Sequence, residues 1–180
     1  EIFLKTKNNN INTREFKKYF NVQESLVEDQ IINIDSNFLI NFSIDDKFNI
    51  NKLDVTSDLN FDNLDVNFKS NLVKKYFENY ENKISIKDPN LSFKYSNDII
   101  NLQLDGKYLL NNKKDNFFIK FEGNKNNFEF YSLLDLDKNI LNLRDIQYYK
   151  RNNIPAKLEI LLNKSKKGFK LKKINFNENQ

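Results

Sequence analysis

The chain has 180 residues and a formal net charge of +4, with 29 Lys and Arg residues against 25 Asp and Glu residues, and it contains neither Cys nor His. The missing residue types exclude disulfides, Cys and His nucleophiles, His proton shuttles and zinc sites of ordinary composition. Most cations are scattered among acidic residues, whereas a nucleic-acid-binding protein usually clusters them on one face. We therefore expect no nucleic acid among the partners.

The chain begins at Glu1 without an initiator Met and closes on a polar tail, residues 177–180, so we expect an internal segment of a longer protein. No run approaches the 18 apolar residues of a transmembrane helix, so any membrane contact is expected outside this segment. The mean hydropathy is low, at -0.72, yet 14% of the residues are aromatic. That contrast predicts elements with one apolar and one polar face.

Residues 1–30 are predicted to be a lead-in that contains one short helix. Phe16, Tyr19 and Phe20 recur at helical spacing behind Thr13, whose hydroxyl is a suitable helix cap. This predicts an amphipathic helix over residues 13–20.

Residues 31–176 are predicted to form a β-rich, repetitive segment, because apolar and polar residues alternate along most of its length. Before residue 70 the apolar runs lie at 38–44, 48–50, 53–55, 59–61 and 64–68. After residue 80 they lie at 84–86, 91–95, 100–110, 117–121, 128–130, 134–136, 141–143, 146–148, 154–162 and 169–171. We expect about a dozen strands of roughly five or six residues each.

Residues 70–80 interrupt the alternation. Leu72, Val73, Tyr76 and Tyr80 follow Ser70 at helical spacing, which predicts a second short helix packed on an apolar sheet face or capping its end.

The links between the runs are short and rich in Asn and Asp, at residues 45–46, 97–98, 111–116, 123–127, 137–139 and 150–153. Asn and Asp tolerate the left-handed backbone of tight turns, and short links join antiparallel strands. Gly106, inside the longest run, predicts a bulge or a close approach by another backbone. The predicted fold is mainly β: an antiparallel amphipathic meander that forms a curved, groove-like sheet with one or two short α-helices.

No catalytic or metal site is predicted. Asp135, Asp137 and Asn139 open like a calcium-binding loop, but Ile140 and Ile146 stand where such a loop needs Gly and a bidentate Glu. The three glycines are too far apart to cradle a phosphate. We therefore expect no cofactor and no enzyme activity, since no carboxylate pair can be singled out either.

Six lysines between residues 164 and 173 form the one local cluster of cations. They can contact anionic headgroups or nucleic acid. Alternatively, Lys170 and Lys172 occupy the solvent face of a strand that carries Phe169 and Leu171, where Lys discourages aggregation at sheet edges. The second interpretation is favoured.

Several phrases of the sequence resemble the large AsmA-like envelope proteins of Gram-negative bacteria, particularly those of the YhdP and TamB type. They are Asn71-Leu-Val-Lys-Lys-Tyr-Phe, Ile84-Ser-Ile-Lys-Asp, Ile99-Ile-Asn-Leu-Gln-Leu-Asp-Gly-Lys-Tyr and Asn153-Ile-Pro-Ala-Lys-Leu-Glu-Ile. The resemblance covers residues 30–176. It implies a parent protein anchored in the inner membrane and extending through the periplasm, with a hydrophobic groove that assists phospholipid movement towards the outer membrane.

Either a second sheet or lipid acyl chains can cover the apolar face of such a meander. The leading hypothesis is a non-catalytic lipid-transfer segment whose partners are phospholipid acyl chains and flanking segments of the same chain. The alternative is a structural or adhesive β-sandwich module of a larger surface or scaffold protein. The residues predicted to line a lipid groove are Phe38, Ile40, Phe42, Leu91, Phe93, Ile100, Leu102, Leu104, Phe117, Ile119, Phe121, Phe128, Phe130, Leu158, Ile160 and Leu162.

Overall fold

The computed structural model describes residues 1–20, 27–77 and 80–178. Within these ranges the chain forms twelve strands, two short α-helices and one 3-10 helix. In chain order they are β1 (Ile2–Asn12), α1 (Thr13–Phe20), β2 (Ile31–Ile44), β3 (Ile50–Phe61), β4 (Asn63–Asn67), α2 (Asn71–Tyr76), β5 (Lys83–Ser96), β6 (Ile99–Leu110), β7 (Lys113–Gly123), β8 (Phe128–Asp135), β9 (Leu141–Leu143), η1 (Arg144–Ile146), β10 (Tyr148–Lys150), β11 (Ala156–Ser165) and β12 (Gly168–Glu178).

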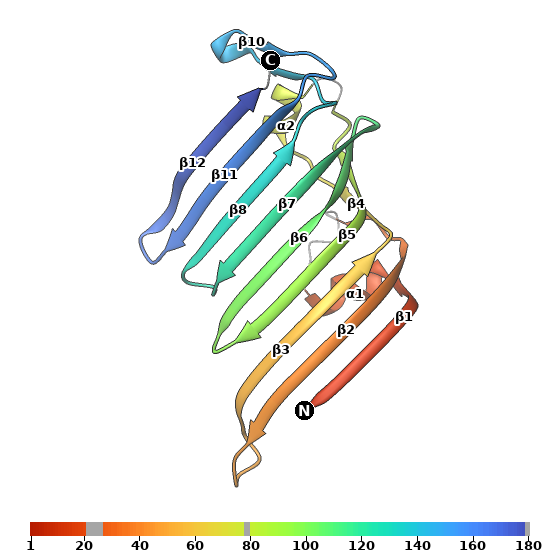
Figure 1. Ribbon diagram of the computed structural model, residues 1–180, viewed down its shortest axis with the longest axis vertical. Coiled ribbons are helices and arrows are strands. Elements are labelled where there is room, and N and C mark those ends of the chain that lie inside the picture. The colour runs from red at the N-terminus through yellow and green to blue at the C-terminus, as the bar shows by residue number, and fades with distance from the viewer. Residues whose placement is uncertain (21–26, 78–79, 179–180) are drawn as a thin grey trace.

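Ten strands form one antiparallel sheet, and β9 and β10 form a separate pair. The order in the large sheet is β1-β2-β3-β5-β6-β7-β8-β11-β12, with β4 hydrogen-bonded to β5 beside the end of β3 (Figure 1). The predicted antiparallel meander is therefore confirmed. The sheet is open, because β1 and β12 are its two edges and do not pair with each other.

Two features of the strands differ from the expectation. Most are 10 to 14 residues long, because neighbouring apolar runs join into single strands. The runs at 84–86 and 91–95, for example, both belong to β5. Residues 2–12, which the sequence analysis placed in the lead-in, form the edge strand β1.

The Asn- and Asp-rich links adopt the backbone that their composition favours. Asn97 and Asp98 both have positive φ, 49° and 61°, as the two-residue turn of a tight hairpin requires. Asn111 and Asn112 do the same, at 52° and 61°, in the turn between β6 and β7. That turn is shorter than the expected link at 111–116, because β7 begins at Lys113.

A line of irregularities crosses the sheet from β1 to β6, and we call it the crease. It comprises Asn8 in β1, Asp62 between β3 and β4, Asp88 and Pro89 in β5, and Gly106 in β6. The register shifts between Thr6 and Asn9 and again between Lys87 and Asn90. Such bulges bend a strand and increase its twist, so the crease accounts for curvature in this half of the sheet.

Gly106 occupies the position in the crease where the predicted close approach is found. A Cβ atom on Gly106 would lie 3.0 Å from the Pro89 Cα and 3.2 Å from the Lys87 carbonyl oxygen. The prediction is confirmed in both of its forms, because the neighbouring strand carries a bulge at this point and its backbone reaches Gly106.

Both predicted helices form: α1 spans the predicted residues 13–20, whereas α2 is shorter than the predicted segment 70–80. Ser70 caps α2 as expected, accepting a hydrogen bond from the Val73 amide at 3.3 Å. The helix ends at Tyr76, because Phe77 is extended and bridges to Leu141.

At α1 the expected cap was wrong. Asn12 accepts from the Arg14 amide at 2.9 Å, whereas the buried Thr13 hydroxyl donates to the Glu28 carbonyl oxygen at 2.7 Å. The side chains of Phe16, Tyr19, Phe20 and Leu72, predicted to form the apolar helix faces, lie outside the described residues.

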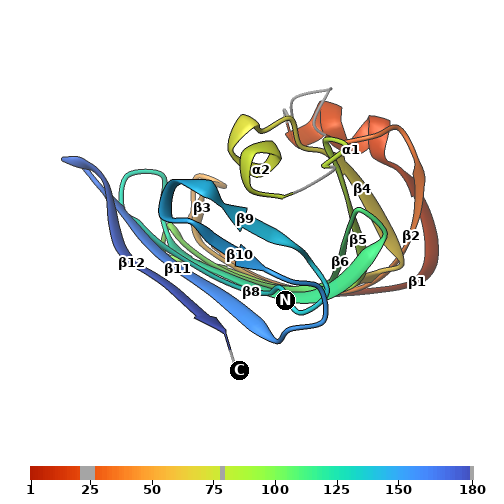
Figure 2. The ribbon, with the colours of Figure 1, turned by 90° about the horizontal axis from the view of Figure 1, so that it is seen from above.

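The sheet is a curved layer, and α1, α2 and the β9–β10 pair lie on its concave side (Figure 2). The main core lies where α2 and β9 meet the ends of the central strands. Its buried residues are Tyr80, Tyr108, Leu110, Phe117, Leu136, Leu141 and Ala156. No helix among the described residues combines the length and apolar character needed to cross a membrane.

Candidate functional site

The strand register places all sixteen residues of the predicted groove on one face of the large sheet, which we call the apolar face. Directly opposed residues of neighbouring strands point to the same side of a sheet. Phe38 therefore shares its face with Ser57 and Phe93, and Phe93 with Leu102. The same face continues across the sheet, because Leu102 pairs with Phe121, Phe121 with Phe130, and Phe130 with Leu162. The remaining predicted residues lie on this face because they are an even number of positions from a paired residue on the same strand.

The apolar face is only partly covered. Of the sixteen predicted residues, Phe117 is buried and Phe42 is 38% exposed, while the other fourteen are half-buried. The opposite face of the central strands carries polar residues such as Asn101, Gln103 and Lys120. The sheet therefore separates a polar outer surface from an apolar surface that its own chain leaves partly open.

One end of the apolar face is closed by the core. Phe117 belongs to the core, and Leu104, Ile119 and Leu158 pack against it. The ring of Phe117 also meets the edge of the Tyr108 ring, with centroids 6.5 Å apart. These four predicted groove residues are thus part of an ordinary hydrophobic core.

A partly open cavity of about 300 Å³ lies at this end, and every residue around it presents apolar surface. It is lined by Phe68, Val73, Phe77, Ile84, Ile86, Leu104, Tyr108, Leu110, Phe117, Ile119, Leu134 and Leu136. Only Leu104, Phe117 and Ile119 were among the predicted groove residues. Most of the other lining residues belong to apolar runs that the sequence analysis had already identified as strands. Their alternation with polar residues was the signal that could have placed them on the apolar face. Val73 comes from α2, the helix that the spacing of residues 70–80 predicted to pack on an apolar sheet face.

The edge strand β12 extends the apolar face beyond the predicted residues. Leu171 pairs with Leu162, Ile174 with Ile160, and Phe176 with Leu158. Leu171 and Ile174 are 52% and 61% exposed. A register shift near Lys172 keeps both on the apolar face although their spacing is odd.

Aromatic rings and one lysine gather where β12 begins. The Lys164 ammonium lies 5.7 Å from the centroid of the Phe128 ring and 5.6 Å from that of Phe169, a geometry that favours cation–π attraction. Its Nζ also donates to the Lys125 carbonyl oxygen at 2.9 Å. Of the two lysines expected on the solvent face, Lys170 pairs with Asn163 on the polar face, whereas Lys172 lies at the register shift.

A buried polar cluster closes the sheet end beside the core. Lys150 is fully buried, and its ammonium donates to the carbonyl oxygens of Asp137 at 3.2 Å, Asn139 at 2.9 Å and Arg151 at 3.1 Å. Burial lowers the pKa of Lys150, and the same desolvation raises the pKa of the nearby Asp115 carboxyl. Asp115 accepts from the Asn139 amide at 2.7 Å. The cluster ties β7 to β10 and to the loop before β9.

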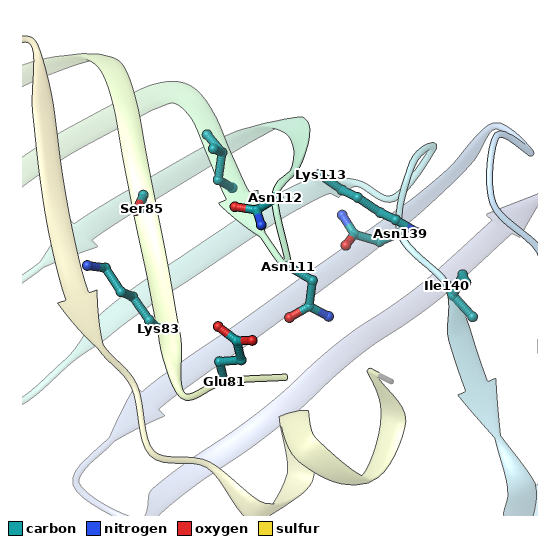
Figure 3. A pocket seen from close by; sticks show the side chains of 9 residues that line it. Glu81, Lys83, Ser85, Asn111, Asn112, Lys113, Asn139 and Ile140 are labelled. Atoms are coloured by element: carbon teal, nitrogen blue, oxygen red, sulfur yellow. The ribbon is translucent and has the colours of Figure 1, made fainter. Parts of the chain in front are cut away.

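A polar pocket of about 550 Å³ lies next to this cluster (Figure 3). It is lined by Glu81, Lys83, Ser85, Leu109, Asn111, Asn112, Lys113, Asn139 and Ile140. Lys83 is held by Asp65 at 2.9 Å and Glu28 at 3.0 Å, and these two carboxylates raise its pKa. Asn139 is likewise hydrogen-bonded to Asp115. The side chains of Lys83 and Asn139 are therefore already engaged in contacts that stabilise the fold. No group of three acidic residues suited to a metal ion occurs in the described ranges.

Comparison of the chain with family models, with curated proteins and with solved structures finds no match.

Proposed function

We propose that this chain is a non-catalytic lipid-binding segment whose apolar face holds phospholipid acyl chains. The observation that carries the proposal is the half-buried apolar stripe that crosses the open sheet from Phe42 in β2 to Leu162 in β11. An acyl chain on this stripe would gain about 0.8 kcal/mol for each methylene removed from water.

The extent of the stripe supports a bound apolar ligand over an ordinary solvent-facing sheet. A monomeric soluble protein rarely leaves a large contiguous apolar patch uncovered. The second sheet of a sandwich does not cover it here, since the only other sheet among the described residues is the two-stranded β9–β10 pair. A long, narrow and flexible ligand suits a face that extends across many strands.

The resemblance to AsmA-like proteins gives the proposal its cellular setting. It implies a parent protein of the cell envelope, anchored in the inner membrane, with flanking segments of the same chain beside this one. The open edges β1 and β12 suit such neighbours, because each presents unpaired backbone groups. In this setting the apolar face would assist phospholipid movement between the inner and outer membranes.

The test is native mass spectrometry with lipid extraction, on the longest soluble form of the protein that contains this chain, expressed in a Gram-negative host. Leu102→Asp places a charge on the open part of the apolar face, and Gln103→Asp places the same charge on the polar face of the same strand. We expect phospholipid to co-purify with the unchanged protein and with Gln103→Asp, and to be lost from Leu102→Asp. Circular dichroism checks that both variants fold.

Leu104 and Ile119 are less suitable positions for this test. Both pack against the core, so an Asp there would unfold the chain whether or not lipid binds. A folded, lipid-free protein would contradict the proposal and favour a structural or adhesive role. So would equal lipid retention by Leu102→Asp and Gln103→Asp.

A further inference from the structure

We propose that the tip of the β2–β3 hairpin, residues 44–50, inserts into the interfacial layer of a phospholipid bilayer. This inference goes beyond lipid binding on the apolar face and does not depend on it. It concerns a protruding turn at the end of the sheet away from the β9–β10 pair (Figure 1).

The tip exposes several large apolar side chains in a small space. Phe48, at its apex, is 89% exposed, and Ile44 and Ile50, which pair across the hairpin, are 52% and 61% exposed. Phe42 and Leu53, the next pair on this face, are 38% and 36% exposed. Apolar side chains gathered in this way mark a surface that meets another apolar phase.

The backbone at the apex provides independent support. Ten described residues other than glycine have positive φ, and nine of them are Asn, Asp or Gln. The tenth is Phe48, at 61°. Bulky residues rarely adopt this conformation, and such outliers are retained where the position has a function. The other described left-handed positions outside glycine carry Asn, Asp or Gln, whereas Phe48 holds an exposed aromatic ring at a strained one.

Hydrogen bonds hold the turn that presents this ring. Asp45 Oδ1 accepts from the backbone amides of Lys47 at 2.9 Å and Asn49 at 2.8 Å. The Phe48 amide donates to the Asp45 carbonyl oxygen at 3.0 Å, and the Asp45 amide donates to that of Asn49, also at 3.0 Å. The apex is therefore preorganised, which lowers the entropy lost when it binds.

Shape and charge favour a bilayer as the occupant. A stable protein interface uses roughly 20–30 residues on each side, far more than this convex turn offers. The tip carries Asp45, Asp46 and Lys47, and beside it Lys52 pairs with Asp54 at 3.6 Å. Charges of both signs suit a zwitterionic headgroup layer. Lysines beside an inserted apolar tip can keep their ammonium groups at the level of the phosphates.

A second hairpin carries residues of a kind that also suits contact with a bilayer. The β11–β12 turn lies at the same end of the strands (Figure 1), and it carries Lys166 and Lys167 beside Phe169, which is 68% exposed. Phosphates of lipid headgroups attract lysines of this kind.

The experiment uses the fact that the protein has no Trp. Phe48→Trp makes an indole the sole probe at the apex, and Tyr149→Trp places one on β10 at the far end of the molecule, where the native ring is 50% exposed. The full chain is titrated with phosphatidylcholine vesicles. We expect the emission of Phe48→Trp to shift to shorter wavelength and to be quenched by brominated lipid, while Tyr149→Trp shows neither change.

Phe48→Asn gives a second readout, because Asn tolerates positive φ and should leave the turn intact. It should lower the partition coefficient for these vesicles by about tenfold or more, since one large apolar side chain is withdrawn. The inference is overturned if the unchanged protein does not bind the vesicles, if Phe48→Asn binds them equally, or if both Trp variants shift alike.

These results are separable from the test of the apolar face. Phe48→Asn should keep its co-purified phospholipid, and Leu102→Asp in the Phe48→Trp background should keep the vesicle-induced shift. Failure of the vesicle experiment alone would remove the inference about the hairpin and leave lipid binding on the apolar face standing.

Discussion

Pro89 in β5 lies so close to Gly106 in β6 that a Cβ atom on Gly106 would stand 3.0 Å from the Pro89 Cα. The contact is between backbones, and both residues belong to the crease. On the other side of Gly106, the ring of Phe117 in β7 leaves no more room, because its Cε1 atom would be 3.3 Å from the same Cβ.

Gly106→Ala is therefore expected to destabilise the protein by about 1–3 kcal/mol, the usual cost of overpacking. The added methyl group can be accommodated only if the β5 bulge or the core ring moves. Urea unfolding followed by circular dichroism measures the change. An unchanged unfolding midpoint would show that the β5 bulge or the Phe117 ring moves aside for the methyl group without a loss of stability.

Lys150→Met should lower the free energy of unfolding by about 1–4 kcal/mol. The substitution keeps an unbranched apolar stem but leaves three buried carbonyl oxygens without their donor. Lys138→Met is the matched control, because Lys138 is exposed and its loss should change stability by less than about 0.5 kcal/mol. Equal effects of the two substitutions would contradict a structural role for the buried ammonium.

Acid should destabilise Asp115→Asn more than it destabilises the unchanged protein. Burial raises the pKa of Asp115 above 3.8, so its contribution to stability is full below that value and is lost as pH rises through the raised pKa. Asp54 and Asp145, whose pKa values are lowered by Ser96 and Lys75, contribute above 3.8 and lose that contribution on acidification. Removing Asp115 removes the opposing effect. The loss of stability between about pH 6 and about pH 3 is measured by thermal unfolding of both proteins. Equal losses in the unchanged protein and in Asp115→Asn would contradict the prediction.

Phe48→Asn should raise the free energy of unfolding by about 1 kcal/mol, because the left-handed backbone costs a bulky L-residue roughly 1–2 kcal/mol and Asn less. Thermal unfolding in the absence of lipid measures the gain. A lower melting temperature would mean that the exposed ring makes a stabilising contact in the free protein.

Strand alternation predicted the fold class, and it grouped the sixteen residues predicted to line a groove on one face of the sheet. It succeeded because the period of two is preserved along uninterrupted stretches of strand, as from Ile100 to Leu110 in β6. The predicted strand lengths failed at the bulges. In β5 the apolar positions are even at Ile84 and Ile86 but odd at Leu91 and Phe93, so a single strand looks like two.

Other features leave no periodic signal in the sequence. β1 was missed because its apolar residues Phe3 and Leu4 are adjacent, and its centre is a polar run. The burial of Lys150 depends on three carbonyl groups brought together by the loops around β9 and β10. The exposed fraction of the apolar face also depends on where α2 and β9 pack against it. That position is set by tertiary contacts, which the alternation of residues along the chain does not encode.

The order of strands in the large sheet has a consequence for how the molecule is assembled and enlarged. Most strands pair with the one that precedes them in the chain, so most contacts close short loops and cost little chain entropy. Folding can begin at any of these hairpins and spread outward in both directions, as in repeat proteins. The width of the sheet is then set by the number of hairpins that the chain supplies, and two further strands can be added at an edge without altering those already in place.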